Sequence, residues 1–333
     1  MTRTKIDYGI DLGTTNSAIS RIESGQPIIK KTDTLKDTLP SCVYINKKKA
    51  IQVGDSAYNA LKREKLKAMK SWNASDDNAF IEFKRTMGTD ESYPSSNLDK
   101  DLSSEELSAE VLKTLKSFVK DESVNSIVIT VPAAFLNNQK EATRKAAKLA
   151  GFDHIELLQE PVAAAMAYGV ESDKKDGFWL VFDFGGGTFD SAIVTINERE
   201  LKVKDHHGNN FLGGLDIDLS IISGILVPNI ENITSNEGLN EKLNSEDLSY
   251  QKLSKYLLYK AEELKKELSV KKEAWVELNY PEFDLELEFI VKREELERIV
   301  EPYFIESYQI LEELVSENSM SFNDFERIIL VGG

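Results

Sequence analysis

The sequence is poor in the residues that form disulfides and soft-metal sites. Cys42 is the only cysteine and there are three histidines among 333 residues. One cysteine cannot form an internal disulfide, and it excludes a zinc site built from cysteines. His206 and His207 are adjacent. Because adjacent residues of a strand point to opposite faces, we interpret this pair as a polar strand end and not as a metal site.

Long apolar runs and excess positive charge are also missing. The longest apolar stretch, residues 162–170, has about half the length that spans a bilayer, and no apolar signal core follows Met1. The chain carries 41 Lys and Arg against 57 Asp and Glu, a net charge of −16. This charge repels a polyphosphate backbone and argues against general binding of nucleic acid. We expect a cytoplasmic protein with no nucleic-acid or membrane partner, in which any anionic ligand is held by backbone amides, lysines or a metal.

The remaining composition is that of a globular protein. Hydrophobic residues make up 41% and charged residues 29%, which argues against a disordered or collagen-like chain. The length predicts about two domains.

A repeated unit supports this division. Residues 6–10 form an extended apolar run that leads into Asp11-Leu12-Gly13-Thr14-Thr15, and residues 178–182 lead into Asp183-Phe184-Gly185-Gly186-Gly187-Thr188. A second strand-like run follows each turn, so both units predict a β-hairpin. The repeats lie about half the chain apart, which predicts two related lobes at residues 1–170 and 171–333.

Helices and strands alternate between the repeats and after them. Ser103 and Glu106 form a capping box that opens a helix, residues 126–131 predict a strand, and Asn137 can cap the helix that follows. Further helices are expected at 160–167, 216–227, 245–268 and 293–316, strands around Pro281 and at 328–331, and loops at 90–100 and 232–246. This alternation predicts an α/β fold. Because the chain ends at Gly332-Gly333 directly after a strand, we expect further structural units in a longer protein.

The two glycine turns carry the chemistry. Glycine lets the backbone approach a ligand, and successive N–H groups in a turn form an anion nest. Two such turns can grip a polyphosphate from both sides. Asp11 and Asp183 would repel it unless Mg²⁺ lay between them, because Mg²⁺ binds one or two carboxylates together with phosphate oxygens. The alternative is that each turn is only a hairpin with a capping Asp.

Six segments together resemble the nucleotide-binding domain of the Hsp70 chaperones, in the actin/hexokinase ATPase superfamily. They occur in the family's order and cover almost the whole chain: residues 9–17, 131–133, 160–169, 182–190, 212–214 and 331–333. The short first lobe, with Phe83-Lys84-Arg85 near its middle, is most similar to specialised bacterial paralogues of the HscC type. The resemblance implies a duplicated actin-like (ribonuclease H-like) fold with two lobes around a nucleotide cleft, slow hydrolysis of ATP to ADP, Mg²⁺ as cofactor and K⁺ as a second ion.

The resemblance also assigns roles to single residues. It implies that Lys84 sits by the γ-phosphate and holds the attacking water, that Glu160 holds water in the metal shell, and that Asp183 and Thr188 orient the water and the γ-phosphate. It places Asp11, Asp183 and Glu160 around Mg²⁺, largely through water, and Asp190 at a monovalent cation. The implied nucleotide-binding residues are Gly13, Thr14, Thr15, Asn16, Gly185, Gly186, Gly187, Thr188, Gly213, Gly214, Glu262, Lys265, Lys266, Ser269, Gly332 and Gly333.

The sequence departs from the family pattern at four positions. Leu215 replaces a carboxylate after Gly213-Gly214, Lys266 replaces an arginine, Ala134 replaces an aromatic residue, and Glu156 replaces a basic one. The last two put ordinary coupling to a J-domain protein in doubt. Full-length family members also bind client peptides and a nucleotide exchange factor, and we expect the isolated domain to be a monomer without the peptide-binding domain.

Two other functions remain open on the residues alone. One is a sugar or metabolite kinase on the same fold. The other is a non-catalytic nucleotide-sensing module or an actin-like filament protein. The altered residues near the turns are consistent with the sensing module.

Overall fold

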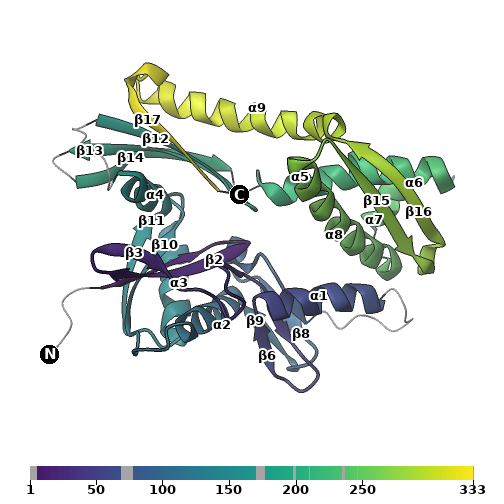
Figure 1. Cartoon of the computed structure of the whole chain (residues 1–333), viewed down its shortest axis with the longest axis horizontal. Coiled ribbons are helices and arrows are strands. Elements are labelled where there is room, and N and C mark those ends of the chain that lie inside the picture. The colour runs from purple at the N-terminus through teal and green to yellow at the C-terminus, as the bar shows by residue number, and fades with distance from the viewer. Residues whose placement is uncertain are drawn as a thin grey trace. The chain divides into compact units, whose positions relative to one another are not determined.

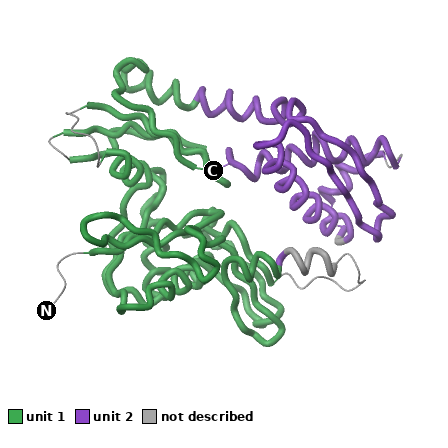
Figure 2. Tube along the Cα trace, viewed as in Figure 1, with its two compact units in different colours: residues 1–60, 76–210, 310–333 green, residues 61–75, 211–309 purple. Residues whose placement is uncertain are grey.

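The computed structural model describes residues 6–68, 78–169, 177–197, 200–209, 211–234, 237–245 and 247–332. These residues belong to two compact units (Figure 2). Unit 1 draws on residues 1–60, 76–210 and 310–333, and unit 2 on residues 61–75 and 211–309. Figure 1 shows the helices and strands along the chain.

The first hairpin of the repeat belongs to a six-stranded sheet of unit 1. Its strands are β1 (Tyr8–Leu12), β2 (Asn16–Glu23), β3 (Gln26–Ile29), β4 (Leu39–Pro40), β10 (Ser126–Val131) and β11 (His154–Gln159). The order is β11-β10-β1-β2-β3, with β4 paired to β2, and β1 runs parallel to β10. The apolar residues of β1 and β10 pack with α2 (Ser104–Ser117) and α3 (Asn137–Leu149) in one core. This sheet therefore fixes the position of the first glycine turn.

The second hairpin begins a separate four-stranded sheet of unit 1, in the order β14-β13-β12-β17. Its strands are β12 (Gly177–Phe184), β13 (Phe189–Asn197), β14 (Glu200–Asn209) and β17 (Phe325–Gly332). Because both repeats form a hairpin, as the sequence predicts, each glycine turn is the connection between two antiparallel strands. Helix α4 (Glu160–Gly169) contacts strands of both sheets.

Smaller elements complete unit 1. Strands β5 (Val43–Ile45), β6 (Ile51–Val53) and β7 (Ala79–Phe80) form a small sheet, and α1 (Asp55–Ala68) begins beside it. The 3-10 helix η1 (Phe83–Thr86) follows β7. The expected loop at 90–100 is wrong in part, because β8 (Ser92–Ser95) and β9 (Lys100–Ser103) pair as a hairpin. The two strands are polar and show little alternation of apolar residues, so the sequence pattern did not indicate this hairpin.

Unit 2 combines helices with one hairpin. Its helices are α5 (Gly214–Ile221), a π-helical segment η2 (Ile222–Leu226), α6 (Val227–Thr234), α7 (Leu239–Leu243) and α8 (Leu248–Val270). Strands β15 (Glu273–Tyr280) and β16 (Leu285–Lys292) pair around the 3-10 helix η3 (Pro281–Phe283). The expected loop at 232–246 is wrong where α6 and α7 enter it.

Helix α9 (Arg293–Glu317) contributes to both units and is followed by η4 (Phe322–Asp324). At its start, Arg293 Nε donates to the carbonyl oxygens of Leu268 (2.9 Å) and Lys271 (3.0 Å). A positive side chain thus satisfies carbonyl groups at the C-terminal end of α8.

Two predicted caps have different outcomes. The capping box of Ser103 and Glu106 is confirmed, with both reciprocal hydrogen bonds present at the start of α2. Asn137 does not cap α3. The N-cap residue is Leu136, whose N–H donates to Gln139 Oε1 at 2.9 Å.

Candidate functional site

The first glycine turn is held by contacts to residue 41. Ser41 Oγ donates to the Gly13 carbonyl oxygen at 2.7 Å, and Ser41 N–H donates to the Thr15 carbonyl oxygen at 2.8 Å. A Cβ at Gly13 would lie 2.1 Å from the Asn16 carbonyl oxygen. The turn therefore needs glycine at this position, since no side chain fits so close to the backbone.

The second glycine turn faces the first one. It closes through Gly185 N–H, which donates to the Thr188 carbonyl oxygen at 2.9 Å. A Cβ at Gly186 would lie 2.1 Å from Thr15 Oγ1, and one at Gly187 would lie 3.1 Å from Thr14 Cγ2. Turns that are far apart in the sequence thus meet within unit 1.

The second glycine turn leaves backbone N–H groups unused. Across the described ranges, the N–H groups of Gly186, Gly187 and Thr188 donate to no other protein atom. Free consecutive amides in a turn are the donors that bind an anion such as phosphate.

Lys84 lies in a buried ion pair. It belongs to η1, its side chain is 9% exposed, and its Nζ is 2.8 Å from Glu160 Oε1 at the start of α4. The Phe135 ring centroid is 5.9 Å from this ammonium. Burial alone lowers the pKa of Lys84, but the carboxylates of Glu160, Asp11 and Asp190 outweigh it and raise the pKa. The ammonium therefore stays charged.

The carboxylates come from the ends of both hairpins. Asp11 Oδ1 accepts a hydrogen bond from Thr130 Oγ1 at 2.8 Å. Asp183 lies directly opposite Asp190 across β12 and β13. Burial and the charges of Glu160 and Asp190 raise the pKa of Asp183 to about 7.

The pKa of Asp190 and of Glu160 is also raised by burial. A hydrogen bond from Thr188 opposes the shift at Asp190, and the Lys84 ammonium opposes it at Glu160. Like charges directly opposite in a sheet destabilise it. Burial is the largest cause of these raised pKa values, and neighbouring carboxylates add to it at Asp183 and Glu160.

A cation fits this charge arrangement. Four carboxylates face one ammonium, so a bound divalent cation would offset the excess. Within the described ranges, no group of three or more His, Cys, Asp or Glu can hold a metal directly. The donor set fits Mg²⁺, which keeps several waters and takes few protein ligands.

The predicted nucleoside-binding residues belong to unit 2. Lys265 Nζ, on α8, is 2.7 Å from the Gly214 carbonyl oxygen and 2.8 Å from Asp218 Oδ2 on α5. Lys266 pairs with Glu262 at 2.5 Å, and Ser269 Oγ donates to the Lys266 carbonyl oxygen. The structure thus brings Lys265 to the start of α5, where Gly213 and Gly214 lie.

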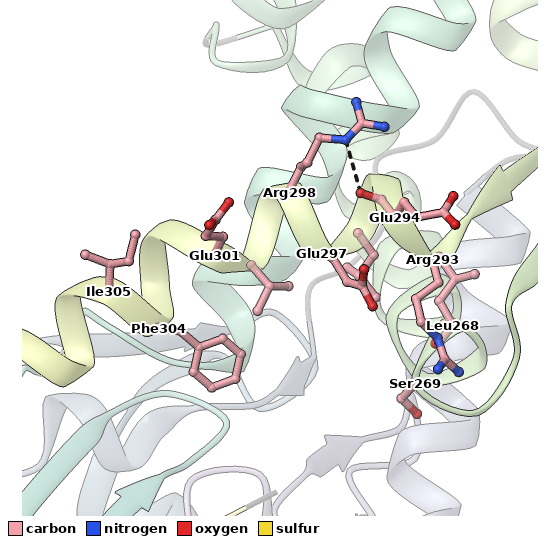
Figure 3. Close-up of a pocket in the computed structure, with 11 residues that line it drawn as sticks. Leu268, Ser269, Arg293, Glu294, Glu297, Arg298, Glu301, Phe304 and Ile305 are labelled. Carbon is pink, nitrogen blue, oxygen red and sulfur yellow. Dashed lines mark hydrogen bonds between the residues drawn. The ribbon is translucent and has the colours of Figure 1, made fainter.

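Ser269 also lines a cavity of about 820 Å³ between the end of α8 and the first half of α9 (Figure 3). The cavity wall includes Arg293, Arg298 and Phe304, and Arg298 Nε donates to the Glu294 carbonyl oxygen at 3.2 Å. Glu262, Lys265 and Lys266 do not line it. Of the predicted nucleoside-binding residues of α8, only Ser269 lines this cavity.

The end of β17 packs on the second hairpin. Gly332 has a φ of +100°, and a Cβ there would lie 2.2 Å from the Phe184 carbonyl oxygen and 3.0 Å from Asp183 Oδ1. This backbone conformation and spacing require glycine. Gly333 lies outside the described residues.

Reasoning from the sequence missed three contributors to the site. Arg85 NH2 donates to the Gly187 carbonyl oxygen, and Thr130 holds Asp11. A Cβ at Gly208 would lie 2.9 Å from Asp190 Oδ1. The position of Arg85 beside Lys84 was the one available signal, because the other two contacts depend on strand pairing.

The fold and this geometry describe an α/β protein in which two glycine turns meet beside a buried lysine and four carboxylates. The family model for "Hsp70 protein" matches residues 7–333. The chain belongs to the Hsp70 family, and the expected duplicated actin-like fold class is confirmed.

Two relatives show the extent of the similarity. The chain is 33% identical to "Chaperone protein DnaK" of Carsonella ruddii (strain PV), over 98% of this chain and 56% of the relative. It is 32% identical to "Chaperone protein DnaK" of Mycoplasmopsis agalactiae, over 99% of this chain and 52% of the relative. The chain therefore spans about half the length of the curated relatives it matches. In the part of the chain that the structure describes, no helix has both the length and the hydropathy needed to cross a bilayer.

Proposed function

We propose that the chain is the ATP-binding and ATP-hydrolysing domain of an Hsp70-type chaperone. The observation that carries the proposal is the Lys84 ammonium, buried 2.8 Å from Glu160 in the unit where the two glycine turns meet. Family membership supports the proposal, since both relatives carry the name of a chaperone.

The glycine turns would hold the phosphates of ATP. The free amides of residues 186–188 would donate to phosphate oxygens from one side, and Gly13, Thr14, Thr15 and Asn16 would face them from the other. The Lys84 ammonium would lie beside the γ-phosphate, where a fixed positive charge stabilises the charge that develops during transfer to water.

The carboxylates would serve the metal and the attacking water. Asp11, Glu160 and Asp183 would hold Mg²⁺ through its water shell, and Asp190 would bind a monovalent cation such as K⁺. Mg²⁺, when bound with the nucleotide, supplies positive charge to the phosphate oxygens. Asp183 and Thr188 would orient the water and the γ-phosphate.

Unit 2 would recognise the adenosine. An ammonium has three donors, and Lys265 uses two of them on Gly214 and Asp218, so one remains for the nucleoside. Glu262, Lys266, Ser269 and Gly213 would complete the contacts, with Gly332 and Gly333 near the sugar and phosphate. Lys266 cannot fork hydrogen bonds as an arginine does, which predicts weaker adenine binding than in the common family pattern.

The same proposal extends to a longer protein. Movement of lobes 1–170 and 171–333 on hydrolysis would control a C-terminal peptide-binding domain. The proposed partners are client peptides, a J-domain protein and a nucleotide exchange factor. This domain is proposed to be a monomer. Its proposed location is the cytoplasm. Ala134 and Glu156 would change the coupling to these partners, and Leu215 would alter ion binding or lobe closure.

Single-turnover hydrolysis of ATP with Mg²⁺ tests the proposal. We expect slow hydrolysis that falls by about a hundredfold in Lys84→Ala, while ATP still binds, because one fixed transition-state donor is lost. Lys113→Ala is the matched control, since Lys113 is half-exposed and pairs with Glu110 one turn away on α2. ATP binding without hydrolysis that depends on Lys84 would contradict catalysis and favour a nucleotide-sensing module.

A further inference from the structure

Arg85 connects the helix that carries Lys84 to the second glycine turn. Its NH2 donates to the Gly187 carbonyl oxygen, and its NH1 is 3.7 Å from Glu82 Oε2. The Arg85 side chain is 18% exposed, and Gly187 is buried. A Cβ at Gly187 would lie 2.7 Å from Arg85 Nε, so the guanidinium packs directly on the turn.

This contact determines where one amide of the turn points. No described peptide bond is cis, so the Gly187 carbonyl and the Thr188 N–H point in opposite directions across one planar peptide. When Arg85 holds the carbonyl oxygen, it also directs the Thr188 N–H away from the guanidinium. That N–H is one of the three free amides of the turn.

Lys84 and Arg85 are neighbours in η1, yet their side chains reach different parts of unit 1. Lys84 binds Glu160 at the start of α4, and Arg85 binds the turn between β12 and β13. The short helix η1 is therefore attached both to the start of α4 and to the second glycine turn. The position of the Lys84 ammonium is tied to the orientation of the amides.

We propose that Arg85 is a positioning residue for the phosphates, one that orients the free Thr188 amide of the second glycine turn and aligns it with Lys84. The proposal rests on the proposed function, because it takes the turn to bind the phosphates of a nucleotide. Arg85 acts through the Gly187 peptide and is not a catalytic residue.

The geometry requires an arginine. A planar guanidinium reaches the Gly187 carbonyl and the Glu82 carboxylate at the same time from fixed directions, whereas a lysine ammonium is a point charge on a flexible stem. Glu82 has left-handed backbone angles, with φ of +59°, which for a residue other than glycine is uncommon. We expect Arg85→Lys to keep the positive charge but to lose the fixed orientation of the Gly187 peptide.

The test compares three ligands: ATP, ADP and adenosine, each measured by calorimetry with Mg²⁺. In Arg85→Lys and Arg85→Gln we expect ATP and ADP to bind about tenfold more weakly, and adenosine to bind as in the wild type, because adenosine has no phosphate. Arg144→Gln is the matched control, since Arg144 pairs with Glu141 on the exposed face of α3. It should leave all three affinities unchanged.

The outcomes separate this role from the proposed function. Equal binding of ATP and ADP by the Arg85 variants and the wild type would overturn the role of Arg85 alone. Equal weakening of all three ligands would also overturn it, because that pattern indicates a general structural defect. A wild-type chain that binds no ATP would contradict the proposed function and, with it, the role of Arg85.

Discussion

Asp218 is a buried carboxylate whose charge costs stability at neutral pH. Its side chain is 8% exposed, and Oδ2 is 2.8 Å from Lys265 Nζ. Its other oxygen, Oδ1, is buried and has no hydrogen-bond partner among the described residues. Burial, only partly opposed by Lys265, raises the pKa of Asp218 to about 6, with Glu262 adding to the rise and Lys266 opposing it.

The direction of the pH effect follows from this shift. The ordinary pKa of the carboxyl is 3.8, so between that value and about 6 the folded chain binds more protons than the unfolded chain. Stability from this group is therefore greatest at low pH and is lost as the pH rises through this window. Above the window the folded chain carries the whole net cost of the charged carboxylate, which is the cost of burial less the attraction of Lys265, about 3 kcal/mol.

Asp218→Asn removes the titration and keeps the shape. We expect the free energy of unfolding of the variant, minus that of the wild type, to increase by about 1.4 kcal/mol from about pH 5 to about pH 8. This range covers the part of the titration window that lies above pH 5. The change with pH is the quantity of interest, because replacing the carboxyl by an amide also alters the hydrogen bond with Lys265 at both pH values. Urea unfolding followed by circular dichroism at each pH measures it.

A control in unit 2 identifies the source of the effect. Glu241→Gln changes an exposed carboxylate and should show no such trend. A difference between Asp218→Asn and the wild type that is constant with pH would refute the reasoning, because it would mean that Asp218 titrates alike in the folded and unfolded chain. A trend of opposite sign would mean that Lys265 stabilises the carboxylate more than burial destabilises it.

Two further predictions concern the first glycine turn and the start of α2. Gly13→Ala should weaken ATP binding by at least about tenfold, because the new Cβ would lie 2.1 Å from the Asn16 carbonyl oxygen and overpacking typically costs about 1–3 kcal/mol. Gly9→Ala, whose Cβ would meet its nearest atom at 3.5 Å, is the control, and equal affinities measured by calorimetry would contradict the role of the turn. Ser103→Ala should lower the free energy of unfolding by about 1 kcal/mol through loss of the capping box, and an unchanged urea midpoint would show that α2 does not depend on its cap.

Local patterns in the sequence predicted both repeated hairpins and several of the helices. Strand β10 covers residues 126–131, as its β-rich run indicates, and both hairpins form around the two glycine turns. These predictions succeed because a capping box, a glycine turn or an apolar alternation depends on residues only a few positions apart. The polar hairpin of β8 and β9 lacks such alternation and was missed.

Recognition of the site depended on the resemblance to the Hsp70 family. The two Asp-x-Gly turns alone predicted a pair of phosphate-binding hairpins, and the role of Lys84 came only from the family pattern. Nothing in the local sequence distinguishes Lys84 from the other lysines, and its partner Glu160 lies far along the chain.

The sequence by itself determined the hairpins, the capped helix α2 and the family to which the chain belongs. Only the tertiary structure decided that Gly186 meets Thr15, that Arg85 holds the Gly187 carbonyl and that Asp218 is buried beside Lys265. The physical reason is that these contacts arise from the packing of separate strands and helices. Burial and charge then act between residues that the sequence keeps far apart.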